Sequence, residues 1–227
     1  MTGAVLFDMD GVLLDSRHAT LATLAGIATA ALGRRVTAAD LPPDALTNPR
    51  VEVLTGLGVA EADELCALWW DPALATATGT GTTLFPGVLE GLTAIKDAGI
   101  ATGLVTLQTR TRLPWLLARA VLALLDVTVC REDAEAKPAP DGLLLALGKL
   151  GADPFETAFL GDTVGDIAAA RAAGITPLGA AWGYAGPAAL KAAGAAAVLD
   201  DPIRIGPGLL DFTSCPRTGL TATTRTR

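Results

Sequence analysis

The chain has 227 residues, of which 51% are hydrophobic, and a formal net charge of −7 at pH 7. This length and apolar content suit one folded core with a small accessory domain and exclude an intrinsically disordered chain. The acid excess argues against a nucleic-acid partner, because such binding is driven by clustered Lys and Arg that neutralise phosphates, so a small ligand is expected instead.

The first predicted element is a buried strand over residues 4–7, Ala-Val-Leu-Phe, which ends at a turn containing Gly11. Asp8 and Asp10 follow this strand, so both carboxylates lie at its carboxyl end, where open α/β sheets bind ligands. No Lys or Arg stands beside them in the sequence to pair with them. The pair therefore predicts a bound cation.

The next segment, residues 17–82, has helical pattern at residues 18–32 and 61–70 and no convincing strand. A low-complexity Thr/Gly stretch at residues 76–83 reads as a hinge. We therefore predict a helical cap inserted after the first strand, and expect Arg50 to be the charged cap residue that faces the site.

From Ile100 onward, short apolar runs alternate with longer periodic segments. Strands are expected at residues 101–105, 126–130, 158–160, 175–178 and 197–199. Helices are expected between them at about residues 110–125, 141–150, 165–173 and 187–193. This alternation predicts an α/β fold, a Rossmann-like doubly wound parallel sheet covered by helices on both faces.

The predicted organisation is thus an α/β core made of residues 1–16 and 83–212, with the cap at residues 17–82. Residues 213–227 lack an apolar period, and we expect a flexible tail there. The three cysteines are widely spaced without a Cys-x-x-Cys pair, so we expect reduced thiols. We also expect a cytoplasmic protein without a signal peptide or a membrane span, because the amino terminus lacks a basic leader and glycines and prolines interrupt the longest uncharged stretch.

Three later strand ends also carry polar residues. Thr106 closes the strand at 101–105, Lys137 lies in the proline-stiffened loop Ala-Lys-Pro-Ala-Pro, and Asp162 and Asp166 follow the strand at 158–160. Helix capping by Asp162 explains one acid, but not two acids plus the earlier Asp pair. Four carboxylates without a neighbouring His or Cys favour a hard, oxygen-seeking ion such as Mg²⁺.

These pieces, in this order along the chain, resemble the haloacid dehalogenase-like hydrolase superfamily. The resemblance covers roughly residues 4–212 and rests on the strings DMDGVLLDS, KPAPD and GDTVGD, with LFPGV at residues 84–88 similar to the return from a small helical cap. The chain most resembles the branch that contains phosphoglycolate phosphatase and β-phosphoglucomutase. The resemblance implies a Mg²⁺-dependent phosphatase acting on a small-molecule phosphomonoester such as a sugar phosphate, phosphoglycolate or a specialised-metabolite phosphate.

The resemblance also implies roles for the acidic residues. Asp8 would be the nucleophile that forms an aspartyl-phosphate, and Asp10 the general acid and later the general base. The metal would be held by the Asp8 carboxylate, the Asp10 backbone carbonyl and Asp162. Asp166 would support the metal through water or orient Lys137.

The remaining implied residues bind the phosphoryl group. A carboxylate approaching a phosphate dianion meets a repulsion of about 8 kcal/mol, taking about 4 kcal/mol for each charge pair at an effective dielectric constant near 20. Lys137 would hold Asp8 and the phosphoryl oxygens and so reduce that repulsion. Thr106 and the Leu107 amide would hydrogen-bond the phosphoryl group, with Gln108 as a further substrate-binding candidate.

Single residues distinguish this activity from others that the same family supports. Asp10 argues against a metal-free dehalogenase, and a cap without lysine argues against a phosphonoacetaldehyde hydrolase with its Schiff base. A phosphomutase of the β-phosphoglucomutase type is the alternative. It places a His five residues after the acid that ends the first motif, where this chain has Thr20, while His18 comes two residues early. A non-catalytic metal-binding scaffold is the third possibility, and the protein is expected to be a monomer or a homodimer.

Overall fold

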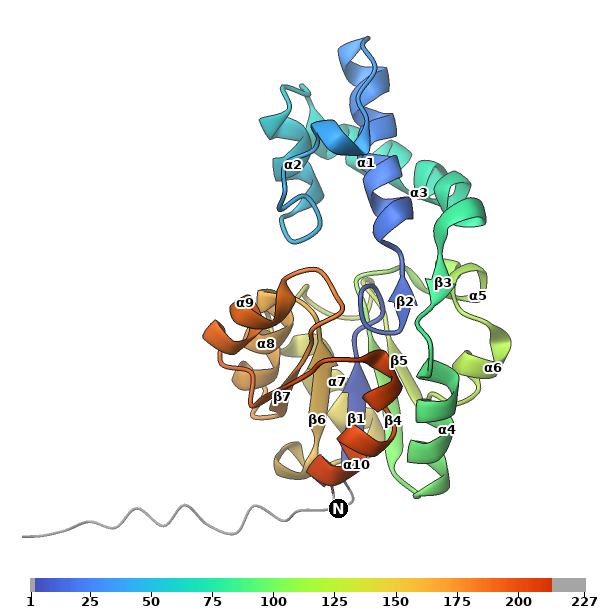
Figure 1. The fold of residues 1–227 in the computed structure, drawn as a ribbon, viewed down its shortest axis with the longest axis vertical. Coiled ribbons are helices and arrows are strands. Elements are labelled where there is room, and N and C mark those ends of the chain that lie inside the picture. The colour runs from blue at the N-terminus through green and yellow to red at the C-terminus, as the bar shows by residue number, and fades with distance from the viewer. Residues whose placement is uncertain (1–2, 214–227) are drawn as a thin grey trace, which may run out of the picture.

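The computed structural model describes residues 3–213. The expected tail, residues 213–227, lies outside the described residues apart from Thr213. Six parallel strands form the central sheet in the order β5-β4-β1-β6-β7-β8 (Figure 1). They are β1 Ala4–Phe7, β4 Ala101–Val105, β5 Val127–Val129, β6 Ala158–Gly161, β7 Thr176–Ala180 and β8 Ala197–Leu199. The predicted α/β, Rossmann-like parallel sheet is confirmed.

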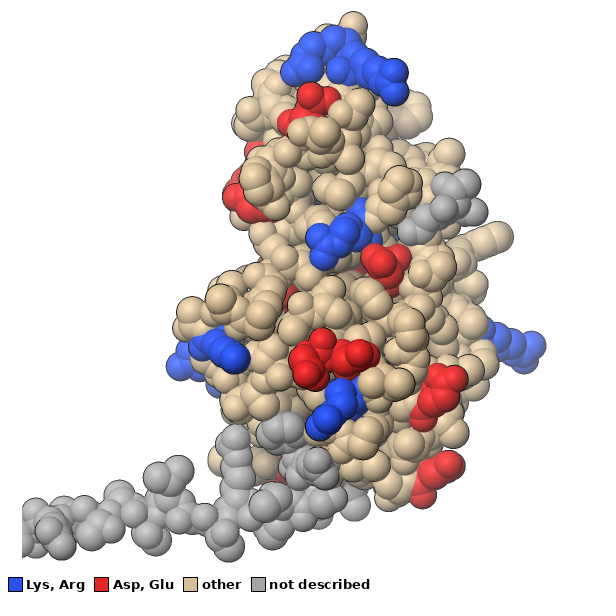
Figure 2. Space-filling view, in the orientation of Figure 1, with Lys and Arg blue, Asp and Glu red and all other residues tan. Residues whose placement is uncertain are grey.

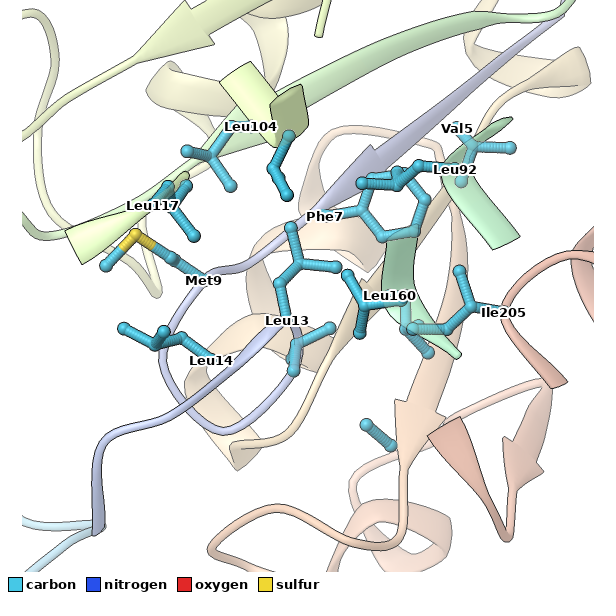
Figure 3. Close-up of a cluster of buried hydrophobic side chains, with 14 of the residues drawn as sticks. Val5, Phe7, Met9, Leu13, Leu14, Leu92, Leu104, Leu117, Leu160 and Ile205 are labelled. Carbon is cyan, nitrogen blue, oxygen red and sulfur yellow. The ribbon is translucent and has the colours of Figure 1, made fainter. Parts of the chain in front are cut away.

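Helices cover the sheet on both faces because alternate residues of each buried strand point to opposite sides. Val5 and Phe7 belong to one core cluster, which α4, α5, α6 and α10 complete, and Figure 3 shows part of it. Ala4 and Leu6 belong to the other, which α7 and α8 cover. The helices of this unit are α4 Val88–Asp97, α5 Leu113–Leu116, α6 Arg119–Leu122, α7 Asp141–Leu150, α8 Val164–Ala172, α9 Gly186–Ala192 and α10 Pro207–Thr213. Short 3-10 turns, η2 Arg110–Arg112, η3 Pro154–Glu156 and η4 Pro202–Arg204, lie between them.

The chain order places a topological switch at β1. After β1 the chain builds β4 and β5 on one side, then crosses over to build β6, β7 and β8 on the other. Ligands of open α/β sheets bind outside the carboxyl ends of the strands at such a point. The end of β1, where Asp8 stands, is therefore the place for a site.

A helical unit stands beyond this edge of the sheet (Figure 1). Its elements are α1 Arg17–Leu32, η1 Ala38–Asp40, α2 Arg50–Gly56 and α3 Ala62–Gly81, and they enclose an apolar cluster of their own. The antiparallel pair β2 Leu14–Asp15 and β3 Thr83–Leu84 carries the chain out of the core and back. We refer to residues 17–82 as the cap and to the rest of the described chain as the core.

Two predicted elements differ from the structure. The Thr/Gly hinge at residues 76–83 is wrong as far as Gly81, since α3 continues to that residue. Thr76 and Thr78 donate their hydroxyls to the carbonyls of Pro72 and Ala75, so these polar side chains are satisfied within the helix.

The single helix expected at residues 110–125 is likewise wrong, because the chain forms η2, α5 and α6 there. Leu117 adopts an extended backbone between α5 and α6. Leu116, Leu117 and Val121 are all buried in one core cluster, so burial overrides the helical pattern.

None of the helices in residues 3–213 combines the length and the hydropathy that spanning a bilayer requires.

Candidate active site

Three buried carboxylates converge at the edge of the sheet. Ligand oxygens of Asp8, Asp162 and Asp166 all lie within 4.8 Å of one another. Strand pairing produces this arrangement, because Phe7 of β1 lies opposite Leu160 of β6, Asp8 follows Phe7, and Asp162 follows one residue later on its own strand, after Gly161. Acids 154 positions apart in sequence, Asp8 and Asp162, thereby share one site.

The loop after β1 fixes Asp10 through apolar anchors. Val12, Leu13 and Leu14 are buried in the core cluster, and the amides of Leu13 and Leu14 both donate to the Met9 carbonyl at 2.9 Å. The loop therefore folds back on itself at the carboxyl end of the strand. This explains why an apolar run follows the two acids in the sequence.

Asp162 is placed by close contacts with the backbone. Its Oδ2 accepts a hydrogen bond from the Tyr184 amide at 2.8 Å. A Cβ at Gly11, whose φ is +80°, would lie 2.1 Å from the same oxygen, so only glycine fits there. The other oxygen, Oδ1, is buried and has no hydrogen-bond partner among the described residues.

These residues fit a divalent cation. A buried carboxylate oxygen without a partner is costly, and a metal ion would satisfy it. The donor set around it consists of carboxylate oxygens, which suits a hard cation such as Mg²⁺ rather than zinc. Asp8 and Asp162 are the side chains that would hold the ion.

Lys137 is the cation that the protein itself supplies. Its Nζ lies 2.5 Å from Asp8 Oδ1, 2.6 Å from Asp166 Oδ1 and 3.2 Å from the Val105 carbonyl oxygen. The Lys137 side chain is 8% exposed. The lysine thus bridges two acids that would otherwise repel each other at close range.

Asp166 also helps to cap helix α8. Its Oδ2 accepts from the Thr163 amide at 3.0 Å and from the Thr163 hydroxyl at 2.6 Å, which forms a capping box at the start of α8. The residue that caps this helix is Thr163, so capping by Asp162, the alternative raised from the sequence, does not occur. With Oδ2 engaged in the cap and Oδ1 beside Lys137, the geometry favours Asp166 as the residue that orients Lys137.

A hydrogen-bond network holds both oxygens of Asp10. Ser16 donates its hydroxyl to Oδ1 at 2.5 Å, and Gln108 donates its Nε2 to Oδ2 at 2.9 Å. Tyr184 contributes from the far end of the chain, with its hydroxyl 2.7 Å from Ser16 Oγ. The sequence alone gave no reason to choose Ser16 or Tyr184, because the contact that joins them spans 168 positions.

The turn after β4 presents the remaining core candidates. Thr106 is buried, and its hydroxyl accepts from the Gln108 amide at 3.1 Å. Leu107, between them, is 50% exposed. Gln108, expected only to bind substrate, also positions Asp10.

Arg50 belongs to the cap and not to the acid cluster. It begins α2, and its guanidinium lies 4.6 Å from the ring centroid of Trp70, which is buried in the cap. Burial lowers the pKa of Arg50, and the positive charge of Arg131, a core residue, lowers it further. The expectation that Arg50 faces the site stays a prediction.

Burial raises the pKa of the acids at the sheet edge. It raises the pKa of Asp8 to about 7 against the opposing effect of Lys137. It also raises the pKa of Asp162, and the charges of Asp166 and Asp8 raise it further. The cluster contains three carboxyl groups and one lysine, so when the carboxyl groups are ionised the lysine neutralises only one of them. A metal ion would neutralise the remaining negative charge.

We expect the metal-free protein to lose stability as the pH rises from about 5 to about 8. The Asp8 carboxyl loses its proton near pH 3.8 in the unfolded chain and near pH 7 in the fold. The folded state therefore binds more protons in this window, so the free energy of unfolding falls with pH, by about 3 kcal/mol. Urea unfolding at several pH values measures this fall, which millimolar Mg²⁺ should reverse.

Asp8→Asn is the matched variant for this experiment, because it removes the contribution of Asp8 and should make the fall in stability smaller. A metal-free protein whose stability rises steadily with pH through this window would contradict the expectation.

Comparison with known proteins gives consistent matches. A family model described as haloacid dehalogenase-like hydrolase matches residues 2–174. A phosphoglycolate phosphatase of Xylella fastidiosa is 37% identical over 192 residues, which cover 79% of this chain and 80% of that protein. A solved putative phosphoglycolate phosphatase from Lactobacillus plantarum superposes with a TM-score of 0.78 at 25% identity and covers 93% of this chain and 100% of that one. A putative β-phosphoglucomutase from Thermotoga maritima gives 0.74 at 26% identity, with 93% and 99% covered.

Proposed function

The chain belongs to the haloacid dehalogenase-like hydrolase family, and from this premise we propose that it is a phosphatase that hydrolyses a small-molecule phosphomonoester through an aspartyl-phosphate at Asp8. The observation that carries the proposal is the buried cluster of Asp8, Asp162 and Lys137 at the switch point of the sheet. When bound between Asp8 and Asp162, Mg²⁺ would neutralise charge on the nucleophile and on the phosphoryl oxygens.

Asp8 is the nucleophile in this proposal. Lys137 holds Asp8 Oδ1 at 2.5 Å, which fixes the carboxylate and offsets its charge as a phosphate approaches. The carboxylate forms a bond to phosphorus while the bond from phosphorus to the ester oxygen breaks. In this proposal Thr106 and the Leu107 amide bind the phosphoryl oxygens.

Asp10 moves the protons. Burial raises the pKa of Asp10, so this carboxyl retains a proton more readily than an exposed one, as a general acid must. It gives that proton to the departing alkoxide and, once ionised, takes one from the water that attacks the aspartyl-phosphate. Ser16 and Gln108 hold it in one orientation for both half-reactions.

Hydrolysis is favoured over the mutase alternative by two positions. Thr20 stands where the mutases place a His, and His18 is exposed on α1. The mutases also place a Glu where this chain has Gly161. A Cβ at Gly161 would lie 2.2 Å from Cβ of Asp166, so Asp166 occupies the space that a side chain at position 161 would need.

The test is phosphate release by the purified protein from p-nitrophenyl phosphate and from a panel of sugar phosphates and short acid phosphates. We expect turnover with Mg²⁺ and its loss after chelation, restored by adding the ion. Interconversion of sugar phosphate isomers without phosphate release would favour the mutase. Absence of turnover across the whole panel would favour the non-catalytic scaffold.

A further inference from the structure

One loop of the core contacts both parts of the acidic site. The loop between β7 and α9 contains Tyr184, whose amide donates to Asp162 Oδ2 at 2.8 Å. The hydroxyl of the same residue lies 2.7 Å from Ser16 Oγ, and Ser16 donates to Asp10 Oδ1 at 2.5 Å. Tyr184 is therefore joined directly to an acid that would hold the metal ion and, through one side chain, to the acid that moves the protons.

The hydrogen of each hydroxyl in this chain of contacts can be assigned. A serine hydroxyl has one hydrogen, and Ser16 gives it to Asp10. Ser16 Oγ then accepts from its other neighbour, so the Tyr184 hydroxyl is the donor in the contact at 2.7 Å. Burial raises the pKa of Tyr184, and the charge of Asp10 raises it further, so this hydroxyl keeps the hydrogen that it donates. The two hydrogen bonds run in one direction, and each strengthens the other.

Ser16 does not cap the helix that it precedes. Serine just before a helix commonly accepts a hydrogen bond from one of the first amides of that helix, here α1. Within the described residues, the Ser16 side chain forms no such bond, because its hydroxyl is turned toward Asp10 and Tyr184. Without the tyrosine hydroxyl, the free amides at the start of α1 would compete for Ser16 and draw it away from Asp10.

The contacts around Tyr184 fix the position of its hydroxyl. The guanidinium of Arg17 lies 5.2 Å from the centroid of the Tyr184 ring, and its Nη2 donates to the Gly183 carbonyl at 3.0 Å. Arg17 begins α1, and Figure 2 shows basic and acidic side chains adjoining at the level where the cap meets the core. A Cβ at Gly183 would lie 2.2 Å from Cβ of Asp162, so only glycine lets the loop lie this close to the acid. The ring is thus held by Arg17 on one side and by the loop on the other.

We infer that Tyr184 is a positioning residue for Asp10: through Ser16 it holds the carboxyl group in the orientation that both proton transfers require. The inference rests on the proposed function, because that function assigns the two transfers to Asp10. Tyr184 acts through Ser16 and is not itself the proton donor or acceptor. Since its amide also holds Asp162, one loop helps to set the position of the acid–base group relative to the metal site.

Two kinds of ester separate a loss of positioning from a general loss of structure. The leaving oxygen of an alkyl ester needs a proton from Asp10, whereas the p-nitrophenolate ion leaves without one. The ratio kcat/KM reports the steps up to transfer of the phosphoryl group to Asp8, and kcat also includes hydrolysis of the aspartyl-phosphate, which needs Asp10 as a base for every ester. A misplaced Asp10 should therefore lower kcat/KM for the alkyl ester only, but kcat for both.

The experiment measures Tyr184→Phe with p-nitrophenyl phosphate and with 2-phosphoglycolate or glucose 6-phosphate, whichever the wild type hydrolyses faster. The substitution removes one oxygen and keeps the ring and the backbone amide, so the variant should fold. We expect kcat/KM to fall by about 10-fold for the alkyl ester and to change by less than about 2-fold for p-nitrophenyl phosphate. Rapid mixing with p-nitrophenyl phosphate should show a burst of p-nitrophenolate, followed by a steady rate about 10-fold below that of the wild type.

A double-mutant cycle with Ser16→Ala tests whether the two hydroxyls act as one chain. Ser16→Ala should lower kcat for p-nitrophenyl phosphate by about 10-fold or more. Adding Tyr184→Phe should lower it by less than about 2-fold further, because the tyrosine then has no serine through which to act. If the two losses multiplied, Tyr184 would not act through Ser16.

Trp182→Phe is the matched control. Trp182 lies in the same loop and donates its Nε1 to the Val12 carbonyl at 3.1 Å, so the variant loses one hydrogen bond of the loop but none of the chain that ends at Asp10. It should lower the melting temperature, while kcat/KM for the two esters should change by the same factor.

Equal losses of kcat/KM for the two esters in Tyr184→Phe would overturn the inference, and so would wild-type kcat for both. If the wild type hydrolyses p-nitrophenyl phosphate alone, the burst and the double-mutant cycle decide between the same outcomes. A wild type that releases phosphate from no ester would instead contradict the proposed function. The two failures are therefore distinguishable.

Discussion

Asp8→Asn is expected to lower kcat for every phosphate ester by on the order of 10⁴-fold or more, because an amide cannot attack phosphorus at a useful rate. The side chain keeps its size, and its oxygen still accepts from Lys137, so the fold should survive. Removing one buried negative charge should even stabilise the metal-free protein, since burial raises the pKa of Asp8 to about 7. Loss of activity with retained or increased stability is thus the expected pair of results.

Asp97→Asn is the control for this substitution, because Asp97 ends α4 in an exposed position away from the sheet edge. Asp8→Ala should accompany it, since an Asn side chain can hydrolyse back to Asp during storage. Phosphate release and thermal unfolding are measured on all three variants. If either Asp8 variant kept even a tenth of wild-type kcat, Asp8 would not be the nucleophile.

Lys137→Met is expected to lower kcat by on the order of 10³-fold and to destabilise the protein by about 3 kcal/mol. The substitution keeps most of the buried volume but removes the charge that faces Asp8 and Asp166 at 2.5 and 2.6 Å. Two carboxylates then lie in a buried place without their cation, and breaking such a pair costs more than forming it gains. A phosphate would also meet the full charge of Asp8.

Lys96→Met is the matched control, because Lys96 pairs with Asp126 at 2.6 Å but both side chains are about one third exposed. An exposed pair contributes little, so activity and stability should stay near those of the wild type. Comparable losses in the two lysine variants would show that Lys137 acts only through general folding. A stable Lys137→Met protein with full turnover would remove the lysine from the proposed mechanism.

The acidic cluster was predictable because of one property of parallel sheets. Asp8 and Asp162 each follow an apolar run, and the carboxyl ends of parallel strands meet at one edge, so the pattern predicts that their carboxylates lie together, as they do. Lys137 follows the same logic through its loop. The order of the strands was not readable from the pattern, although it decides that β1 lies between β4 and β6.

The residues that surround Asp10 could not be predicted in the same way. The Ser16–Tyr184 contact and the donation from Gln108 to Asp10 join segments 168 and 98 positions apart. Such pairs depend on how loops from different strand ends pack against one another. Loop packing produces no periodic pattern in the sequence from which the pairs could be predicted. Arg112 lies in a segment that the periodicity predicted to be one long helix. The chain breaks there into η2, α5 and α6, and Arg112 donates a hydrogen bond to Gln108.

Phosphorylation of Asp8 is tested most directly by a rapid acid quench of the Asp10→Asn variant during turnover, followed by mass spectrometry of its peptides. With p-nitrophenyl phosphate as the substrate, the leaving phenolate needs no proton from Asp10, so the intermediate still forms in the variant. Without the general base, water attacks that intermediate slowly, so the covalent species should accumulate. We expect one phosphoryl group on the peptide that contains Asp8, formed with Mg²⁺ and absent after chelation. The central claim is that these acids bind a metal ion so that Asp8 can accept the phosphoryl group. It would be contradicted if the wild-type protein kept its full rate after exhaustive chelation and the variant carried no phosphoryl group on that peptide.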